Sequence, residues 1–196
     1  MTRSVMKKIL IGTHNKGKFK EIASLITKKY KKISPVSLKI KSPKETGRSF
    51  KSNSELKVKF FSRYVKYPVI SDDSGLCVKA LKNKPGIYSA RLAKKYGSFL
   101  NAMKFILKKI KNNKNRKAVF VCSLSYQDEK GKIYTAEGRL KGNISKKILG
   151  KKGFGYDPIF IPLGKKITFA QMPKSKKINM DHRFLAFSKL KKKIKI

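Results

Sequence analysis

Hydrophobic and polar residues follow two different periods along the chain, one typical of helices and one of strands. Between residues 18 and 28, Phe19, Ile22 and Ile26 recur at three- and four-residue spacing, which places them on one face of a helix. Residues 118–126 instead alternate and are rich in Val and Phe, which favours a strand. Helices are expected at residues 18–28, 49–64, 99–110 and 184–190. Strands are expected at residues 5–11, 35–40, 68–71, 76–81, 118–126, 132–138 and 158–162.

The order of these elements predicts an α/β fold with a mixed sheet. Asp128-Glu129-Lys130-Gly131 forms a turn between two strands, which indicates an antiparallel hairpin. The chain has 196 residues, a length typical of one domain or of one domain with two lobes. We expect a single domain over residues 1–196, with a frayed basic tail at residues 191–196.

Composition supports a folded chain. Hydrophobic residues make up 40% of the sequence and aromatic residues 10%, more than a disordered basic tail contains. No apolar run approaches the roughly 18 residues that cross a membrane, and the apolar stretch near the N-terminus is too short for a secretory signal. Cys77 and Cys122 form neither a disulfide framework nor a metal-binding spacing. We therefore expect a soluble, reduced, cytoplasmic protein with no membrane partner.

The net charge of +41 is the most unusual property of the composition. Such a charge is typical of nucleic-acid-binding proteins, because Lys and Arg displace the counterions of phosphates. However, 44 of the 51 cations are Lys and seven are Arg, and the Lys residues are scattered along the chain. Arg is the residue preferred for bidentate phosphate and base contacts. The charge therefore favours compositional drift of surface positions, with no specific nucleic-acid partner.

The segment 12–18, Gly-Thr-His-Asn-Lys-Gly-Lys, lies between a predicted strand and a predicted helix. It fits the first seven positions of a phosphate-binding P-loop, but the eighth position is Phe19, where a P-loop has the Ser or Thr that binds Mg²⁺. A strict P-loop is thus excluded. A turn at a helix N-terminus with nearby lysines still attracts phosphate, and an ordinary strand–helix turn is the alternative.

Three further clusters carry candidate chemistry. Asp72-Asp73-Ser74-Gly75 is expected at the carboxyl end of a buried strand, where open α/β sheets bind ligands. With only ten acidic residues in the chain, adjacent carboxylates suit a Mg²⁺ site, and Glu45 becomes a candidate ligand for the same reason.

The segment 153–158, Gly-Phe-Gly-Tyr-Asp-Pro, contains two aromatic rings that either stack on a base or fill the core. His182-Arg183 alone is a weak signal.

Taken together, these clusters resemble the inosine triphosphate pyrophosphatase family, whose members remove dITP, ITP and XTP. The resemblance extends from Ile9 to about Leu190. The matching motifs are T-x-N-x-x-K at Thr13, Asn15 and Lys18; E-T-G at Glu45, Thr46 and Gly47; Asn53 and Lys57; D-D-S-G-L at 72–76; P-G-x-Y-S-A-R at 85–91; G-F-G-Y-D-P-I-F at 153–160; and Met172, Lys177 and His182-Arg183.

The resemblance implies two lobes with an active-site cleft between them, a twisted mixed sheet flanked by helices, and a homodimer. It also implies hydrolysis of a nucleoside triphosphate between the α and β phosphates. Asp73 is then the catalytic base, and Glu45 and Asp73 hold Mg²⁺. The supporting residues are Asp72, Asn53, Lys57 and Arg91. The substrate-binding residues are Thr13, His14, Asn15, Lys16, Gly17, Lys18, Ser74, Phe154, Gly155, Tyr156, Asp157, Lys177, His182 and Arg183.

Within this set, Phe154 and Tyr156 are expected to enclose the purine, while Asp157, Lys177, His182 and Arg183 read its edge. Two other functions stay open at this point. A basic nucleic-acid-binding protein would leave the acidic residues without a purpose. A related pyrophosphatase for modified pyrimidine nucleotides would keep the metal carboxylates without the purine-binding set.

Overall fold

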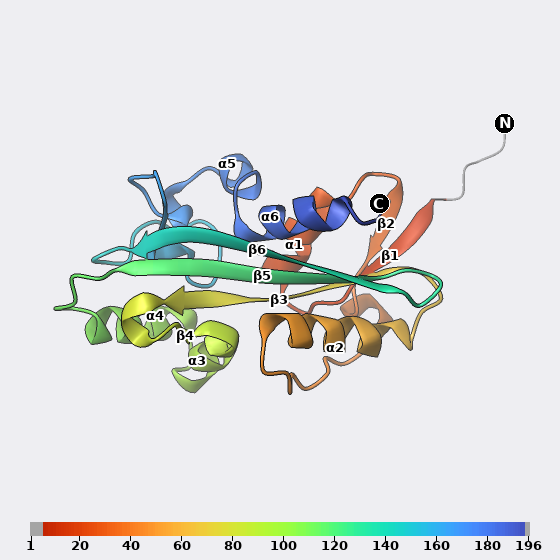
Figure 1. Ribbon diagram of the computed structural model, residues 1–196, viewed down its shortest axis with the longest axis horizontal. Coiled ribbons are helices and arrows are strands. Elements are labelled where there is room, and N and C mark those ends of the chain that lie inside the picture. Colours follow the sequence, from red (N-terminus) through yellow and green to blue (C-terminus); the bar gives the residue numbers. More distant parts are fainter. Residues whose placement is uncertain (1–5, 195–196) are drawn as a thin grey trace. The chain divides into compact units, whose positions relative to one another are not determined.

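The computed structural model describes residues 6–194, in which seven strands and their flanking helices confirm the predicted α/β fold (Figure 1). The strands are hydrogen-bonded in the order β2-β1-β3-β5-β6-β7, with β4 beside β3. The chain divides into two compact units. Unit 1 is Met1–Asp73, Ser123–Glu137 and Ala186–Ile196, and unit 2 is Ser74–Cys122 and Gly138–Leu185. That the whole chain is one domain, with a cleft, stays a prediction.

The elements have the following bounds. The strands are β1 (Lys7–Ile11), β2 (Tyr30–Ile33), β3 (Val69–Val78), β4 (Lys84–Pro85), β5 (Lys117–Gln127), β6 (Ile133–Ile144) and β7 (Phe160–Pro162). The helices are α1 (Lys16–Leu25), α2 (Phe50–Ser62), α3 (Ser89–Lys95), α4 (Phe99–Lys109), α5 (Lys174–Ile178) and α6 (His182–Lys191). Short 3₁₀ turns are η1 (Val36–Leu38), η2 (Lys79–Leu81), η3 (Gly86–Tyr88), η4 (Asp157–Ile159) and η5 (Phe169–Gln171).

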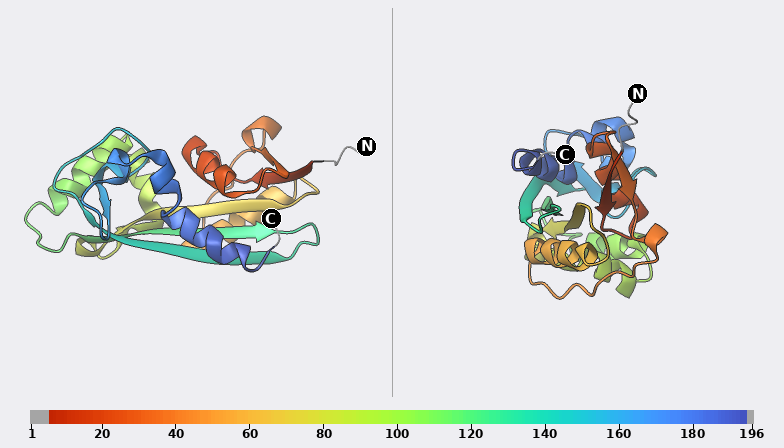
Figure 2. Two further views of the ribbon diagram at one scale, coloured as in Figure 1. Left: turned by 90° about the horizontal axis from the view of Figure 1, so that it is seen from above. Right: turned by 90° about the vertical axis from the view of Figure 1, so that its right-hand side faces the viewer.

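In unit 1, β1 lies between β2 and β3 and is parallel to both. The chain passes from β1 to β2 through α1, and then back across β1 to β3 through α2. Because such crossovers are right-handed, the two helices fall on opposite faces of the strands, as Figures 1 and 2 show. A core of Leu10, Ile40, Val58, Phe61 and Val69 packs between β1, β3 and α2.

In unit 2, β4 pairs with β3 and β7 pairs with β6, both antiparallel. Helices α3 and α4 lie together on one face of these strands (Figure 1). The amphipathic α4 buries Ala102, Met103 and Ile106 in a core that also contains Phe160 and Phe169. Each fully buried side chain of this size contributes about 1.5–3 kcal/mol.

Side-chain caps fix where the predicted helices begin. The Asn15 side chain accepts a hydrogen bond from the Lys18 N–H at the start of α1. Ser49 and Ser52 form a capping box at the start of α2, and Ser98 caps α4. Ser and Asn are favoured at these positions because their oxygens satisfy N–H groups that have no helical partner. These caps position the elements that carry most of the candidate site of unit 1.

The predicted strand at residues 35–40 is wrong. The strand that pairs with β1 is β2, Tyr30–Ile33, and the chain then turns through η1. The Ile40 N–H donates to the Pro35 carbonyl, and Lys39 has a left-handed φ of 55°, so this segment folds onto itself. Within this segment, Val36 and Leu38 are exposed.

The two strands predicted at residues 68–71 and 76–81 are one continuous strand, β3, followed by η2. Asp72-Asp73-Ser74-Gly75 therefore lies inside a strand and not in a turn at its end. Helices α3 and α5 were not predicted, the predicted β6 is shorter than the observed strand, and the predicted β7 includes part of the 3₁₀ turn η4. Lys191 ends α6 and the Lys193 N–H donates to the Leu190 carbonyl; that the tail at residues 191–196 is frayed stays a prediction. Residues 195–196 lie outside the described residues.

Within the described residues 6–194, no helix combines the length and the apolar character that a membrane crossing requires.

Candidate functional site

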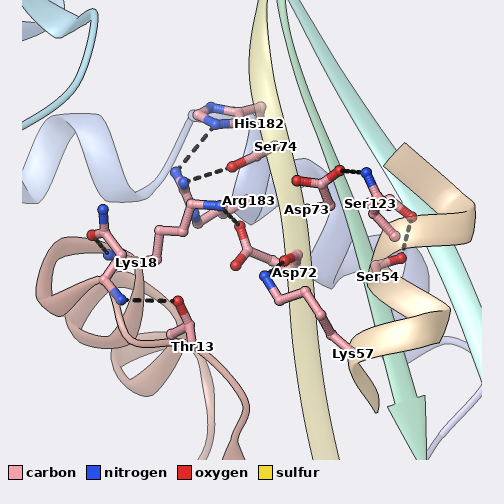
Figure 3. A network of polar contacts seen from close by, with 12 residues as sticks. Thr13, Lys18, Ser54, Lys57, Asp72, Asp73, Ser74, Ser123, His182 and Arg183 are labelled. Carbon is pink, nitrogen blue, oxygen red and sulfur yellow. Dashed lines mark hydrogen bonds and ion pairs between the residues drawn. The ribbon is translucent and has the colours of Figure 1, made fainter. Parts of the chain in front are cut away.

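The centre of β3 carries two adjacent carboxylates in unit 1. Successive side chains of a strand point to opposite faces, so Asp72 and Asp73 have different surroundings. Both are almost completely buried. Buried carboxylates require charged or hydrogen-bonding partners, and α1 and α2 supply them (Figure 3). Polar residues can therefore occupy the middle of a buried strand, which a pattern based on hydrophobicity does not predict.

Asp72 forms an ion pair with Lys18 of α1, with 3.0 Å between Lys18 Nζ and Asp72 Oδ2. The Asp72 main-chain carbonyl accepts a hydrogen bond from Lys57 Nζ of α2, at 2.6 Å. Lys57 Nζ also lies 3.4 Å from Glu45 Oε1. Lys18 of α1 and Lys57 of α2 thus lie beside the β3 carboxylates, and Lys57 links Glu45 to β3.

Asp73 accepts a hydrogen bond at 2.9 Å from the Asn53 side chain, which reaches its Oδ2 atom. The Asn53 amide reaches Oδ2 and not the other carboxylate oxygen, Oδ1. Burial raises the pKa of the Asp73 carboxyl to about 6, and the charge of Glu45 also raises it, while Lys18, Asn53 and Lys57 lower it. A carboxyl with such a pKa changes its protonation near neutral pH, which suits a proton acceptor.

This raised pKa predicts that Asp73 lowers the stability of the protein without bound metal. Below about pH 4 the carboxyl is neutral in both the folded and the unfolded chain. Above about pH 6 it is ionised in both, and its burial then lowers the free energy of unfolding by about 3 kcal/mol. Asp73→Asn should therefore raise the free energy of unfolding at pH 7.5, and the gain should shrink toward pH 4.5. Urea unfolding with a chelator at both pH values measures this. An equal gain at both pH values would contradict it.

His14 is predicted to bind substrate, but the structure gives its ring another role. Its Nε2 lies 2.9 Å from the Ile40 carbonyl and its Nδ1 lies 2.7 Å from the Ser42 hydroxyl. Because a carbonyl only accepts, Nε2 carries the proton in the neutral ring, and Nδ1 accepts from Ser42. His14 thereby fastens the loop that leads to Glu45, and neither ring nitrogen is left for a ligand.

The remaining residues of the turn before α1 divide into two groups. Thr13 and Asn15 hold the turn itself, since Thr13 Oγ1 accepts from the Asn15 N–H at 3.2 Å and Asn15 caps the helix. Lys16 and Gly17 occupy the first turn of α1, where main-chain N–H groups have no preceding helical carbonyl. Together with Lys18, this first turn is the part of the segment that presents donors to an anion.

A buried hydroxyl cluster beside Asn53 has no counterpart in the sequence analysis. Ser54 Oγ of α2 lies 2.9 Å from Ser123 Oγ and 2.8 Å from Ser125 Oγ of β5, and Figure 3 includes the first of these contacts. All three residues are fully buried. The cluster fixes the residue next to Asn53 against the sheet. Serines at alternating positions in an otherwise apolar strand are the signal that indicates it.

A second group of predicted residues comes together in unit 2, around the loop before η4. Asp157 Oδ2 accepts from the Phe154 N–H at 2.9 Å and forms a buried ion pair with Lys177 Nζ at 2.5 Å. Gly153 has a φ of +76°, and a Cβ at this position would lie 2.0 Å from Asp157 Oδ2. Only glycine permits this approach, so Gly153 is required for the Asp157–Lys177 pair.

Cations surround the Phe154 ring. Lys177 Nζ lies 4.8 Å and the Arg183 guanidinium 5.3 Å from its centroid. Arg183 donates to Ser74 Oγ at 3.0 Å, and its Nη1 lies 3.1 Å from His182 Nε2 (Figure 3). Because arginine has no acceptor, the Nε2 atom of His182 accepts, and its Nδ1 carries the proton in the neutral ring.

The His182 ring stacks on Phe120, with the centroids 4.7 Å apart and the planes inclined by 8°. Asp181, directly before it, accepts from the N–H groups of Arg183 and Phe184 and so holds the start of α6. The stacking and this cap fix the orientation of both His182 and Arg183. Phe120 was not predicted as a site residue, since it reads as an ordinary strand residue.

The predicted roles of Tyr156 and Arg91 stay predictions, and in the structure both side chains make other contacts. Tyr156 is expected to enclose a purine, but its side chain is buried in the core, with its ring against Phe99 and its hydroxyl donating to the Ser89 carbonyl. Burial also raises the pKa of Tyr156. Arg91 is exposed, and its guanidinium carbon lies 5.0 Å from the centroid of the Tyr88 ring. Gly155 has a left-handed φ of 65° and shapes the loop beside Phe154.

Comparisons with known proteins show which family the chain resembles along its length. The family model described as the Ham1 family matches residues 9–193. The chain is 41% identical to the dITP/XTP pyrophosphatase of Leptospira interrogans, over 96% of this chain and 98% of the relative. It is 40% identical to the dITP/XTP pyrophosphatase of Dictyoglomus thermophilum, over 93% and 92% of the two chains. The structure of the Ham1 protein of Staphylococcus aureus superimposes with a TM-score of 0.84 at 34% identity, over 95% of this chain and 97% of that one.

Proposed function

Since the chain belongs to the Ham1 family, we propose that it hydrolyses the non-standard purine nucleotides dITP, ITP and XTP to the monophosphate and pyrophosphate. Membership confirms the resemblance drawn from the motifs. Relatives that match nearly the whole chain bear the name dITP/XTP pyrophosphatase. The observation that carries the proposal is the buried Asp73 carboxylate, held by Asn53 and flanked by Lys18 and Lys57.

The phosphate end of the substrate is assigned to unit 1. Lys18 and the first-turn N–H groups of Lys16 and Gly17 would bind the phosphates, since a helix N-terminus and a nearby ammonium both favour anions. Asp73 would accept a proton from the attacking water through Oδ1, because Asn53 already occupies Oδ2. Asp72, fixed by Lys18, keeps that lysine in place. The bond between the α and β phosphates then breaks, and pyrophosphate leaves.

The proposal includes Mg²⁺, and the residues fit this ion. Nucleotide pyrophosphatases generally depend on a divalent cation, which neutralises charge on the phosphates. Glu45 and Asp73 are carboxylates, Mg²⁺ prefers such ligands, and the charge of Glu45 disfavours ionisation of Asp73. Within residues 6–194, no three His, Cys, Asp or Glu side chains form a metal-binding group. We therefore assign two protein ligands, with substrate oxygens and water as the others.

The base is assigned to unit 2. Phe154 would stack on the purine, and Arg183, oriented by His182 and Ser74, would donate to its 6-keto oxygen. Adenine has a 6-amino group at this position, so its binding would leave a buried donor without a partner. A mismatch of this kind discriminates by about 10⁴ or more. The Asp157–Lys177 pair would hold the loop that carries Phe154.

The two alternative functions have less support. A nucleic-acid-binding protein does not need a buried, lysine-flanked carboxylate at Asp73. A pyrophosphatase for pyrimidines would not need the ordered His182-Arg183 pair, and the relatives named above are named for purine substrates. We also propose that the protein is a cytoplasmic homodimer with a small-molecule nucleotide as its substrate, Mg²⁺ as its cofactor and no specific nucleic-acid partner.

Release of pyrophosphate from ITP, XTP, GTP, ATP and a modified pyrimidine triphosphate, with Mg²⁺ in moderate salt, tests the proposed function. We expect ITP and XTP to be hydrolysed with a kcat/KM at least about a hundredfold above that for ATP. Preference for the pyrimidine, or no hydrolysis of any triphosphate, would refute the proposal.

The contact between His14 and the loop of Glu45 leads to a separate prediction. His14→Ala removes the hydrogen bonds to Ile40 and Ser42, so Glu45 is held less firmly. We expect the Mg²⁺ concentration for half-maximal activity to rise several-fold, with kcat at saturating Mg²⁺ changed by less than about threefold. Ser42→Ala, which removes one of the two contacts, should give an intermediate value. If His14→Ala lowers kcat and leaves the Mg²⁺ dependence unchanged, the ring has a direct role in the reaction.

A further inference from the structure

Acidic residues are distributed unequally between the two units. Unit 2, which the structure describes completely, has 25 Lys and Arg residues but only two acidic residues, Asp157 and Asp181. Both acidic side chains are buried, one paired with Lys177 and the other holding the start of α6. Unit 2 therefore has far more cations than carboxylates of its own, and both of its carboxylates are buried.

A hollow of about 560 Å³ lies on unit 2, where the chain leaves α4 and enters β5. Its lining consists of Leu107, Lys111, Asn112, Asn113, Lys114, Arg116 and Lys146. Four of these seven residues are cations, two are amides, and none is acidic. The concave shape brings together charges from the 111–116 segment and from the residues after β6, which lie about thirty positions apart in the sequence.

Arg116 is the fixed element of this hollow. Its guanidinium donates to three main-chain carbonyls, those of Ile110, Ile144 and Ser145, at 2.6–3.2 Å. Among residues 6–194 it contacts no carboxylate. Burial lowers the pKa of Arg116, because desolvation disfavours its charged form. An anion in the hollow would compensate this charge without any movement of the guanidinium.

We propose that this hollow and the cations around it bind the phosphate backbone of a nucleic acid duplex without reading its sequence. The hollow has no aromatic side chain on which an unpaired base could stack. It contains one arginine, and that side chain is already committed to three carbonyls, so no bidentate contact to a base edge is available. Lysines that contact phosphates position a duplex but carry no sequence information.

The inference does not depend on the proposed pyrophosphatase activity, because it involves none of the residues assigned to that reaction. It does depend on whether nucleic acid binds to the lysines of the hollow or to exposed lysines in general. If the high net charge alone attracts nucleic acid, removal of any three exposed lysines should weaken binding equally. If the hollow is a site, its own lysines should matter far more than others.

The experiment compares two triple variants with the same charge. Lys111→Gln/Lys114→Gln/Lys146→Gln alters the hollow and leaves Arg116 in place. Lys28→Gln/Lys29→Gln/Lys66→Gln removes three exposed lysines of unit 1 as the matched control. Fluorescence anisotropy with two unrelated RNA duplexes of about 20 base pairs, over a series of salt concentrations, gives the affinity and its salt slope. Thermal unfolding verifies that both variants are folded.

We expect the hollow variant to bind at least tenfold more weakly than the unaltered protein, with the slope of log affinity against log salt reduced by about 2–3. The control should change affinity by less than about threefold, and both duplexes should bind alike. Equal loss in both variants would overturn the proposal in favour of dispersed charge. Equal competition by polyglutamate would overturn it in favour of an acidic protein partner.

Discussion

Asp73→Asn is expected to lower the rate of pyrophosphate release from ITP by at least about a thousandfold. General-base catalysis contributes about 10²–10⁴, and the change also removes a negative ligand from the proposed Mg²⁺ site. Asparagine has nearly the same shape and still accepts the hydrogen bond from Asn53. The loss should therefore appear in kcat while the protein remains folded, which single-turnover kinetics and thermal unfolding measure together.

Asp128→Asn is the matched control for this experiment. Asp128 lies in the turn between β5 and β6, where its Oδ1 accepts from the N–H groups of Lys130 and Lys132. Asparagine can make the same contacts, so activity should remain within about twofold of the unaltered protein. If Asp73→Asn also retains activity within that range, another group accepts the proton.

Asp157→Asn is expected to cause the largest loss of stability. Asp157 and Lys177 form an ion pair in which both side chains are at least 95% buried. Removing one partner leaves a buried ammonium among aromatic rings, at a cost of about 3–5 kcal/mol. For a chain of this length, the melting temperature should fall by on the order of 10 °C. Scanning calorimetry measures the change, and the KM for ITP should rise as the Phe154 loop loosens.

The double variant Asp157→Asn/Lys177→Met separates a lost charge pair from a damaged loop. Methionine occupies a similar volume without a charge, so the double variant should recover about half or more of the lost stability. If it is less stable than Asp157→Asn alone, the loss comes from packing or from the Phe154 contact, and the ion pair is not its cause.

The sequence predicts most of the helices of this fold, since their periodicity and their caps agree. Phe19, Ile22 and Ile26 lie in the predicted α1 or beside its end, and Asn15, Ser49 and Ser98 are good N-cap residues. The error in β3 has a clear physical cause. Asp72 and Asp73 look like a turn because an isolated carboxylate is unfavourable in a buried strand. Their lysine and asparagine partners, which are 15 to 54 positions away, make the strand possible.

Some roles within the candidate site were beyond prediction from sequence for a similar reason. A motif shows which residue types occur together but does not show which direction each side chain takes. Tyr156 and His14 both belong to motifs, and both turn toward the protein itself, one into the core and the other to a loop. The hydroxyl cluster of Ser54, Ser123 and Ser125 depends on contacts about seventy residues apart. The alternating serines of β5 indicate one side of it, but no local pattern shows that Ser54 is their partner.

The His14 contact also determines where the length of the chain can vary. β2 is paired with β1 through Ile33, and Ile40 is held by the His14 ring. Both ends of the segment between them, residues 34–39, are therefore fixed, and most of that segment is exposed. The entropy of closing a flexible loop changes slowly with its length, so that doubling it costs only about 0.6 kcal/mol. Insertions between β2 and Ile40 should leave the position of Glu45 unaltered, whereas insertions between Ile40 and Glu45 should displace it.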